Sequence, residues 1–417
     1  MIAKLLNENC ACQTFDPDLL KAKLESDELL QGLYGQIIHG RPNLFSDTTV
    51  FISPDQSASM SATIVAIEET ILNPKFRDLV LSRSPSISQI DNKTKGVFMG
   101  YDFHLSDQGP KLIEVNTNAG GALLNLELAK AQHECCQGSE QFFKHRDELL
   151  NLEKVYYDMF LFEWRVQRGG EKIGLIAIVD DNPEAQYLYP EFQLFQRLFT
   201  KFGTKAVIAD PKDLQLREGK LWYGTEQVDL IYNRLTDFYL ENEAHAVLRA
   251  AHELNSVVLT PSPHHHATYA NKLNLVALSS EAALDDMAVT EKTKEALLSG
   301  IPKTEAVSLS CAENLWERRR GLFFKPASGY GSKAAYRGDK ITRRVWEEIL
   351  QGQYVAQALI PPSKRLIGKD GEKTDLKIDV RAYVYDGQIQ LLAARLYSGQ
   401  TTNFRTSGGG FAPVFIM

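Results

Sequence analysis

Two polar side chains interrupt an apolar, strand-like segment early in the chain. In KLIEVNTNAGG, Glu114 and Asn116 stand two residues apart between apolar neighbours. Side chains alternate between the faces of a strand, so the carboxylate and the amide point to one side, and Ile113 and Val115 point to a core on the other. Such oxygen ligands suit a hard cation such as Mg²⁺. A solvated surface strand explains these letters as well, so the rest of the chain decides between the two interpretations.

A second segment, FFKPASGYGSK, combines a lysine with a loop of small residues. Lys325 ends an apolar run, and Ser328, Gly329, Gly331 and Ser332 follow it. Such loops let backbone N–H groups approach phosphate oxygens, and an adjacent lysine supplies positive charge. The spacing is not that of a Walker A motif. Glycine-rich turns are common, so this segment alone indicates little.

A third segment, DLKIDVRAYVYDG, places an acid and a base on one face of a predicted strand. Asp379 and Arg381 are in phase, whereas Ile378 and Val380 face the other way. An aspartate and an arginine side by side can bind a metal ion and a phosphate or carboxylate. A surface ion pair is the common alternative.

Two further stretches carry residues of interest. Gly408–Gly410, between Arg405 and the apolar end FAPVFIM, suit a close approach of backbone to a ligand. His264–His266, in TPSPHHHATY, are predicted to form a polar loop, because adjacent side chains do not converge on one metal ion.

Composition narrows the class of protein. The chain has 417 residues, 44% of them hydrophobic, and a net charge of −7, which does not favour general nucleic-acid binding. We see no signal peptide and no apolar run long enough to cross a bilayer, so we expect a cytoplasmic protein without a membrane partner.

The segments predict several structural blocks. Residues 1–95 are predicted to be mainly helical, 96–130 to contain a β-hairpin, and 131–171 to form a helical connection. In 172–262 strands alternate with helices, which favours a parallel sheet, although no G-x-G-x-x-G follows the first strand. Residues 263–417 begin with helices and become rich in strands, with a hairpin turn at Asp386-Gly387.

Taken in cyclic order, these segments resemble the ATP-grasp ligases, the superfamily of D-alanine–D-alanine ligase, glutathione synthetase and the ribosomal-protein glutamate ligases. The resemblance covers about 100–121 and 172–417. The final piece of the usual order, GYDFHLSDQGPKLIEVN, stands near the start instead. The matching segments are Lys272, GIPKT at 300–304, KPASGYGSK, VAQALI, DVR and ARLYSGQTTNFRTSGGG. The chain therefore resembles a circularly permuted ATP-grasp, the order also seen in eukaryotic-type glutathione synthetase.

The resemblance implies an α/β (α+β) fold with additional N-terminal helices. It implies a Rossmann-like domain at 172–262 and an ATP-grasp domain at 263–417, with an ATP-binding lobe at about 313–362 and a C-terminal lobe at about 363–417. The permuted hairpin would lie beside the C-terminal sheet, so that Glu114 and Asn116 face Asp379. Tolerance of permutation is expected, because chain termini usually lie close together at the surface.

The resemblance also implies roles for individual residues. The metal ligands would be Asp379, Glu114 and Asn116. The arginines facing the γ-phosphate, an acyl phosphate or a substrate carboxylate would be Arg381, Arg395 and Arg405, and Asn233-Arg234 would contact the acid substrate. The ATP-binding residues would be Lys272, Lys325, Ser328, Gly329, Gly331, Ser332, Gln357, Ala358 and Ile360.

The activity implied is ATP-dependent joining of a carboxylate to an amine through an acyl phosphate. ATP and Mg²⁺ would be the cofactors, an amino acid or small peptide the substrate, and a homodimer is one option for the assembly. Two alternatives stay open: a phosphotransferase acting on a small molecule, and a nucleotide-binding protein without ligase activity. The sequence departs from the family pattern at Gln357-Ala358, Asn403 and Ser407, where an acidic residue, Asp and Asn are usual.

Overall fold

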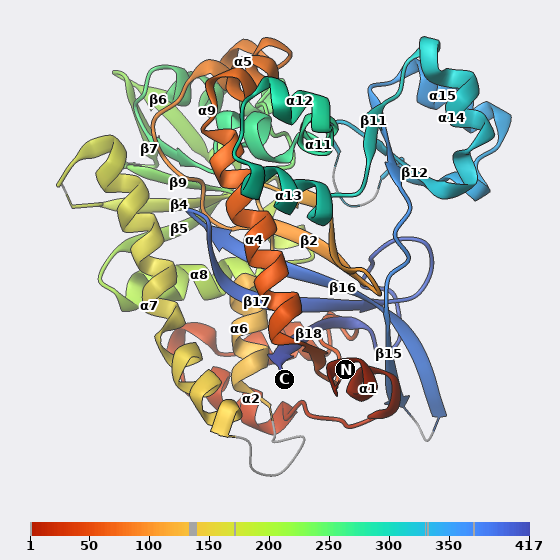
Figure 1. Ribbon diagram of the computed structural model, residues 1–417. Helices are drawn as coiled ribbons and strands as arrows, with labels where there is room; N and C mark the ends of the chain where they lie inside the picture. Colours follow the sequence, from red (N-terminus) through yellow and green to blue (C-terminus); the bar gives the residue numbers. More distant parts are fainter. Residues whose placement is uncertain (1, 133–139, 171, 330, 332, 370–371) are drawn as a thin grey trace.

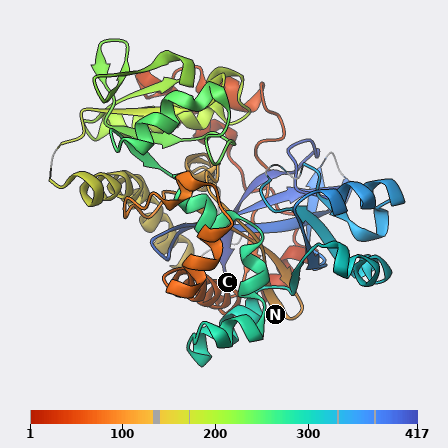
Figure 2. The same cartoon turned by 90° about the horizontal axis from the view of Figure 1, so that it is seen from above.

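The computed structural model describes residues 2–132, 140–170, 172–329, 331, 333–369 and 372–417, without the side chains of 140–147 and 369. The strands form separate sheets, between and around which the helices pack (Figure 1). Seen from above, the parallel sheet and its helices lie on one side of the molecule, and the C-terminal strands lie on the other (Figure 2).

The largest sheet joins the early hairpin to the end of the chain. Its seven strands run in the order β1-β18-β17-β16-β2-β3, with β15 paired to β16. Strand β2 pairs with β16 from Val380 opposite Phe103 to Val384 opposite Met99, which confirms that the hairpin lies beside the C-terminal sheet. Strand β1 was not predicted. The bounds are β1 Val50–Ile52, β2 Met99–Ser106, β3 Gly109–Asn116, β15 Lys364–Lys369, β16 Glu372–Tyr385, β17 Gln388–Tyr397 and β18 Gly410–Ile416.

This sheet has one apolar face and one polar face. Ile378 and Val380 of β16 are fully buried in a cluster with Met60 and Ile64 of helix α4 (Pro54–Ile71), which crosses the sheet in Figure 1. Helix α4 begins at a capping box, in which the Ser53 side chain accepts from the Gln56 N–H and the Gln56 side chain accepts from the Ser53 N–H. The opposite face carries the charged residues of β16, as the alternation predicts.

A second sheet is parallel throughout, as predicted for 172–262. Its strands run in the order β10-β9-β4-β5, and both faces of β4 are covered. Ile176 and Ile178 pack in a cluster with Phe195, whereas Ala177 and Val179 pack in another cluster, which is why this strand is uniformly apolar. The elements are β4 Leu175–Val179, β5 Lys205–Ala209, β9 Leu230–Asn233, β10 Val258–Thr260, α7 Glu140–Arg168, α8 Tyr189–Lys201 and α9 Ala246–Glu253.

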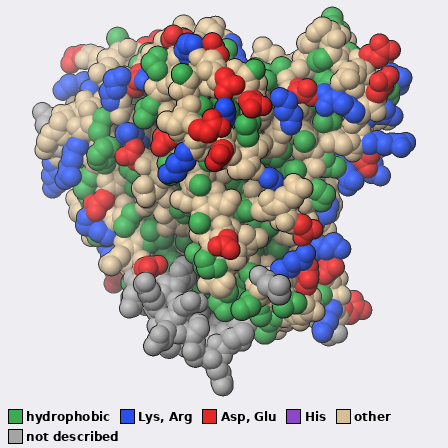
Figure 3. All heavy atoms as spheres, viewed as in Figure 1, with side chains coloured by type: hydrophobic (Ala, Val, Ile, Leu, Met, Phe, Trp, Pro, Cys, Tyr) green, Lys and Arg blue, Asp and Glu red, His purple; other side chains and the backbone are tan. Residues whose placement is uncertain are grey.

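A small lobe at the upper right of Figure 1 holds a third sheet, in the order β11-β14-β12-β13. On the face shown in Figure 3, acidic and basic side chains are interspersed over this lobe and elsewhere. The lobe consists of β11 Thr304–Ala306, β12 Leu322–Pro326, β13 Tyr336–Arg337, β14 Tyr354–Ala358, α14 Ala312–Glu317 and α15 Arg343–Gln351.

The remaining elements connect these sheets or pack beside them. No helix in the described part of the chain is long and apolar enough to cross a membrane. A further small sheet, not predicted, contains β6 Leu214–Arg217, β7 Lys220–Tyr223 and β8 Glu226–Gln227. The other helices are α1 Ile2–Asn9, α2 Pro17–Glu25, α3 Leu33–Ile38, α5 Pro74–Ser82, α6 Ala122–Lys130, α10 Pro263–His265, α11 Asn274–Leu278, α12 Glu281–Asp286 and α13 Glu291–Gly300.

The prediction of a polar loop for the three histidines is wrong. His264 and His265 belong to α10, His266 begins a π-helical turn, and all three are buried. Two of the rings bond to backbone carbonyls: His264 Nδ1 bonds that of Ser88, and His265 Nε2 bonds that of Thr94. Burial lowers the pKa of His265 to about 4, so this ring is neutral at pH 7.

The glycine run has a role in packing. Gly410 adopts φ +110°, and a Cβ atom there would lie 2.6 Å from the carbonyl oxygen of Leu44. A Cβ on Gly409 would lie 2.4 Å from the carbonyl oxygen of Leu396. These glycines therefore approach the backbone of neighbouring segments, whereas the sequence suggested an approach to a ligand.

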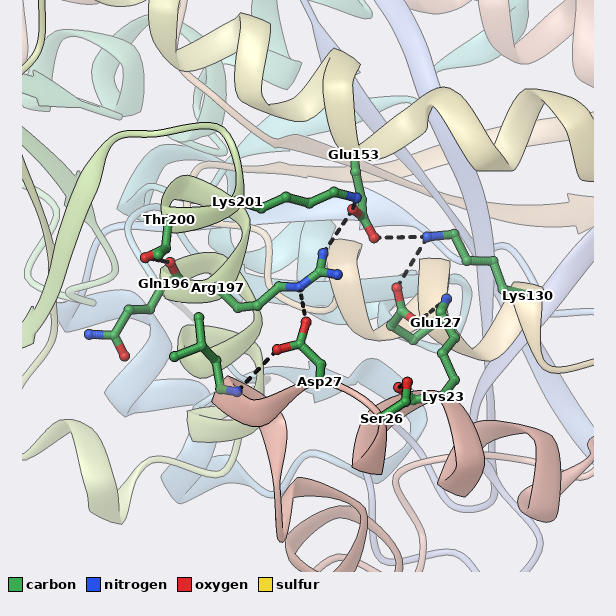
Figure 4. A network of polar contacts seen from close by, with 11 residues as sticks. Lys23, Ser26, Asp27, Glu127, Lys130, Glu153, Gln196, Arg197, Thr200 and Lys201 are labelled. Carbon is green, nitrogen blue, oxygen red and sulfur yellow. Dashed lines mark hydrogen bonds and ion pairs between the residues drawn. The ribbon is translucent and has the colours of Figure 1, made fainter.

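A network of charged residues ties the N-terminal helices to α6, α7 and α8 (Figure 4). Glu153 of α7 accepts from Lys130, Arg197 and Lys201 at 3.0, 2.9 and 2.6 Å. Burial raises the pKa of Glu153, but these three cations outweigh it and hold the pKa at about 2. Arg197 also donates to Asp27, at 2.6 Å. The Glu153 carboxylate thus links α6, α7 and α8, and Arg197 extends the network to Asp27.

We expect Glu153→Gln to lower the free energy of unfolding at pH 7 by about 2 kcal/mol, because three cations lose a common counter-charge. The pKa of Glu153 is lower in the folded chain than its ordinary 4.5, so its contribution is complete above pH 4.5 and is lost as the pH falls towards 2. Urea unfolding at several pH values measures this. The control is Asp158→Asn, in an exposed pair on the same helix, with an effect below about 0.5 kcal/mol. A difference between Glu153→Gln and the wild type that is constant from pH 7 to 3 would contradict the assignment.

Candidate active site

A cavity of about 1070 Å³ lies where the polar face of the large sheet, the carboxyl ends of the parallel strands and the small lobe meet. It collects residues far apart in the sequence, from β2 to the segment after β17. Among the predicted site residues that line it are Glu114, Asn116, Lys272, Lys325, Gly329, Gly331, Gln357, Ala358, Ile360, Asp379, Arg381, Arg395 and Arg405. The cavity therefore brings together most of the residues that the resemblance indicated.

The β2–β3 hairpin contains a bulge that shapes the cavity wall. Asp102 pairs with Glu114, but Phe103 pairs with Leu112, so Ile113 is an extra residue in β3. The predicted burial of Ile113 in a core is wrong for this reason: Ile113 lines the cavity, and its carbonyl accepts a hydrogen bond from Lys325 Nζ at 2.8 Å. Val115 is buried as predicted.

Two lysines approach Glu114 from different segments. Lys325, near the end of β12, is buried and also donates to the Gln357 side chain at 2.9 Å. Lys272 Nζ lies 3.6 Å from Glu114 Oε2 and donates to the Gly329 carbonyl at 3.0 Å. Burial opposes ionisation of Glu114, but the two lysines lower its pKa, so it is a carboxylate at pH 7.

Two arginines and two aspartates form a continuous ion-pair network on the sheet. Arg381 donates to Asp102 through Nε and Nη2, both at 2.6 Å, and Arg395 Nη2 donates to Asp102 Oδ2 at 2.8 Å. Arg395 also donates to Asp379. Asp102 was not among the predicted residues. The sequence did contain a signal for this residue, because a single aspartate stands within the apolar strand FMGYDFHL.

Asp379 keeps one carboxylate oxygen without a partner in the described part of the chain. Its Oδ2 accepts from Arg395 and from Thr402 Oγ1, the latter at 2.9 Å, whereas no described residue donates a hydrogen bond to its buried Oδ1. Burial raises the pKa of Asp379, and Arg395 opposes this shift. An unpaired carboxylate oxygen at 5% exposure of the residue indicates a missing cation or donor.

The donor set fits a magnesium ion. Asn116 Nδ2 donates to Asp102 Oδ2 at 3.1 Å and to Glu114 Oε1 at 3.2 Å, so its Oδ1 is turned away from both carboxylates. Asn116 Oδ1, Asp379 Oδ1 and the Glu114 carboxylate are oxygen ligands of the type that Mg²⁺ prefers. Phosphates and water usually complete the coordination shell of this ion. The described residues contain no cluster of three or more His, Cys, Asp or Glu side chains arranged for a metal ion. Phosphate oxygens would have to supply part of the coordination shell.

The remaining predicted site residues differ in their surroundings and contacts. Ser328 lies within hydrogen-bond distance of His266 Nε2, at 3.3 Å, and Ser332 lies outside the described residues. Arg405 lines the cavity with an exposed side chain. At the end of β14 the Ala358 N–H donates to the Lys303 carbonyl, and just after the strand the Ile360 carbonyl accepts from His104, each at 2.8 Å.

The far end of the cavity is formed by the parallel sheet. Arg234, directly after β9, is buried and lies with its guanidinium 5.7 Å from the ring centre of Phe192. Its Nε has no hydrogen-bond partner. Asp180, directly after β4, also lines the cavity, and burial raises its pKa to about 7, against the opposing charge of Arg234. This end therefore offers a guanidinium group and a carboxyl group that titrates near neutral pH.

The resemblance implies that this cavity binds ADP and Mg²⁺; if it does, we expect ADP affinity to fall as the pH rises above 8. Burial and the charge of Lys272 together lower the pKa of Lys325 to about 8, against the opposing charge of Glu114. The ammonium form dominates below this pH and is lost above it, so affinity should fall by up to about tenfold per pH unit. Titration calorimetry from pH 7 to 9.5 measures this. Lys325→Met should remove the pH dependence of ADP affinity. A wild-type affinity that does not change with pH would contradict this role of Lys325.

Comparisons with known proteins give matches among solved structures. No family model and no curated protein matches the chain. A glutathione synthetase-like effector (GSS30) from Globodera pallida, in its apo form, superposes with a TM-score of 0.54 at 11% identity, covering 96% of this chain and 98% of that one. A putative gamma-glutamylcysteine synthetase from Methylobacillus flagellatus KT gives a TM-score of 0.45 at 10% identity, with coverage of 82% and 84%. The ATP-grasp ligase PsnB, complexed with a minimal precursor, gives 0.31 at 11% identity, with coverage of 58% and 90%.

The match to the Globodera pallida protein spans nearly the whole of both chains, and therefore shows a shared fold. The predicted α/β (α+β) fold is confirmed, and the likeness shows the fold alone. The circular permutation stays a prediction, although the early hairpin does pair with the late strand β16.

Proposed function

We propose that this ATP-grasp protein is an ATP-dependent ligase that joins a carboxylate to an amine. One observation carries the proposal: two lysines and two arginines converge, from four segments of the chain, on a single cavity that also holds Glu114, Asn116 and Asp379. Transfer of a phosphoryl group needs charge neutralisation and positioning rather than a protein nucleophile. A cavity with this set of charges can supply both.

ATP would lie between the small lobe and the large sheet. Lys325 and Lys272 would bind its phosphates, in place of the Gln357 and Gly329 oxygens that they contact in this structure. The segment from Gln357 to Ile360 would line the adenine. Mg²⁺, bound by Glu114, Asn116 and Asp379, would neutralise phosphate charge.

The reaction would proceed in two steps. A substrate carboxylate oxygen attacks the γ-phosphorus, and the bond to ADP breaks. The amine then attacks the carbonyl carbon of the acyl phosphate, and inorganic phosphate leaves as the amide bond forms. Arg381 and Arg395 would stabilise the negative charge that develops on the transferred group, because they are fixed and poorly solvated.

The substrate would occupy the end of the cavity formed by the parallel sheet. Arg234 carries a buried, unpaired Nε, which suits a carboxylate of the substrate. Asp180 lies at the same end and would accept a hydrogen bond from an amine or hydroxyl group. An amino acid or a small peptide carries both kinds of group.

The test is a screen of amino-acid and dipeptide pairs with ATP and Mg²⁺, read as ADP release, followed by mass spectrometry of the product. A ligase yields ADP, phosphate and an amide. A phosphorylated product without an amide would identify a phosphotransferase instead. Nucleotide binding without turnover for any pair would indicate a binding protein, and absence of nucleotide binding would refute the proposal.

A further inference from the structure

Asp102 occupies the centre of the charged face of the large sheet. It lies on β2, with Glu114 of β3 as its cross-strand partner on one side and Arg381 of β16 on the other. Its side chain is 2% exposed. A carboxylate at this depth is stable only when it is paired and hydrogen bonded, so the groups around it explain its presence.

Asp102 accepts four hydrogen bonds, which occupy both of its oxygens. Arg381 donates two of them in a bidentate arrangement at 2.6 Å, Arg395 donates one at 2.8 Å, and Asn116 donates one at 3.1 Å. The arginines outweigh burial and hold the pKa of Asp102 at about 2. Because protein donors engage both of its oxygens, the carboxylate has little capacity left for a metal ion or a substrate.

We infer that Asp102 is a positioning residue for the proposed reaction: it orients the two arginines that would meet the transferred phosphoryl group. A bidentate pair holds the plane of a guanidinium, so the position of Arg381 is fixed before any substrate binds. Arg395 is held between two aspartates, Asp102 and Asp379, and its buried Nε has no partner among the described residues. This leaves a fixed N–H donor for an anion.

The same carboxylate also orients the amide of Asn116. Because Asn116 Nδ2 donates to Asp102 and Glu114, its oxygen is the atom that remains for a cation. An amide rotated by 180° would place that oxygen against two carboxylates, which is repulsive. Asp102 therefore acts on both sides of the reaction, on the arginines for the anion and on Asn116 for Mg²⁺.

The sheet leaves room for this arrangement. Gly100, two residues before Asp102 on the same face of β2, would place a Cβ atom 3.3 Å from Arg381 Nε and 2.6 Å from the Ala119 Cβ. A side chain there would press on the guanidinium that Asp102 binds. Glycine at position 100 therefore leaves space for the Arg381 guanidinium beside Asp102.

The test compares Asp102→Asn with the wild type and with Glu163→Gln. Glu163 is a matched control: it is a buried carboxylate outside the cavity, accepting from the Lys95 N–H at 2.7 Å and from Tyr385 at 2.9 Å. We measure urea unfolding, kcat and KM for ATP with an active pair from the screen, and the Mg²⁺ concentration that gives half-maximal ADP binding in calorimetry.

The inference predicts that Asp102→Asn lowers kcat by about 100-fold with KM for ATP within about threefold, and raises the Mg²⁺ requirement about tenfold. Glu163→Gln changes a carboxylate that is also buried but bonded to no cation of the described residues, and it should leave all three values near those of the wild type. Equal effects of the two variants, or a kcat for Asp102→Asn within threefold of the wild type, would overturn the inference.

A triple variant shows whether Asp102 acts through the arginines. If it does, adding Asp102→Asn to a variant that already carries Arg381→Gln and Arg395→Gln should lower kcat less than threefold further. A full additional 100-fold loss would mean that Asp102 acts on its own, and would overturn the positioning role. The inference rests on the proposed function. Wild-type protein that binds no ADP refutes both, whereas wild-type activity with an insensitive Asp102 refutes only the inference.

Discussion

Lys325→Met should lower the rate of ATP-dependent product formation by about 100- to 1000-fold. The Lys325 ammonium is buried in the cavity, 2.8 Å from the Ile113 carbonyl, and no other described cation is bonded to that carbonyl. Its removal leaves phosphate charge unmatched where little water can replace it. ADP release with an active substrate pair measures the loss.

Methionine keeps the length and apolar stem of the lysine, so the fold should be preserved. Lys340→Met is the matched control: this lysine lies in the same lobe but is exposed and away from the cavity. It should retain wild-type turnover. If Lys325→Met kept more than about a tenth of the activity, the site of ATP phosphate binding would lie elsewhere.

Glu114→Gln should lower Mg²⁺-dependent turnover by at least about 100-fold and raise the Mg²⁺ concentration needed for ADP binding. Glutamine is nearly isosteric but removes the negative charge that would face both the metal ion and the two lysines. Because Lys272 and Lys325 would repel a cation once Glu114 is neutral, the effect should be larger on metal-dependent binding than on stability.

The control for this change is Glu68→Gln, since Glu68 is a carboxylate that accepts from Tyr101 at 3.0 Å and Tyr269 at 2.7 Å outside the cavity. It should affect stability and leave the Mg²⁺ requirement unchanged. A Glu114→Gln variant with a normal Mg²⁺ requirement would remove Glu114 from the metal site, and with it the interpretation of the early hairpin.

Short-range sequence patterns were informative for features that depend on only a few neighbouring residues. The alternation of Asp379 and Arg381 with Ile378 and Val380 predicted a strand with one polar face, and β16 has it. Turn residues predicted both hairpins for the same reason, since the turn conformation depends on a few neighbouring residues. His264–His266 were misread, because burial of their rings depends on packing with segments more than 150 residues away.

The central carboxylate of the site could not be found in this way. Asp102 is a single aspartate in an apolar strand, and its meaning depends on Arg381 and Arg395, which lie 279 and 293 residues further along the chain. The bulge at Ile113 was also unpredicted, because it arises from the register of two paired strands. Neither feature leaves a local pattern.

The sequence by itself determined the two hairpins, the parallel strands, the polar face of β16 and, through the order of its motifs, the fold class; it did not determine β1 or the small sheet of β6, β7 and β8. The properties that it determined depend on side-chain alternation and on turn conformations, which are encoded within a few residues. Only the tertiary structure decided which charges meet. Pairing of β2 with β16 brings an acid from one end of the chain against two arginines from the other, and a charge buried in that contact has no signature until both strands are in place.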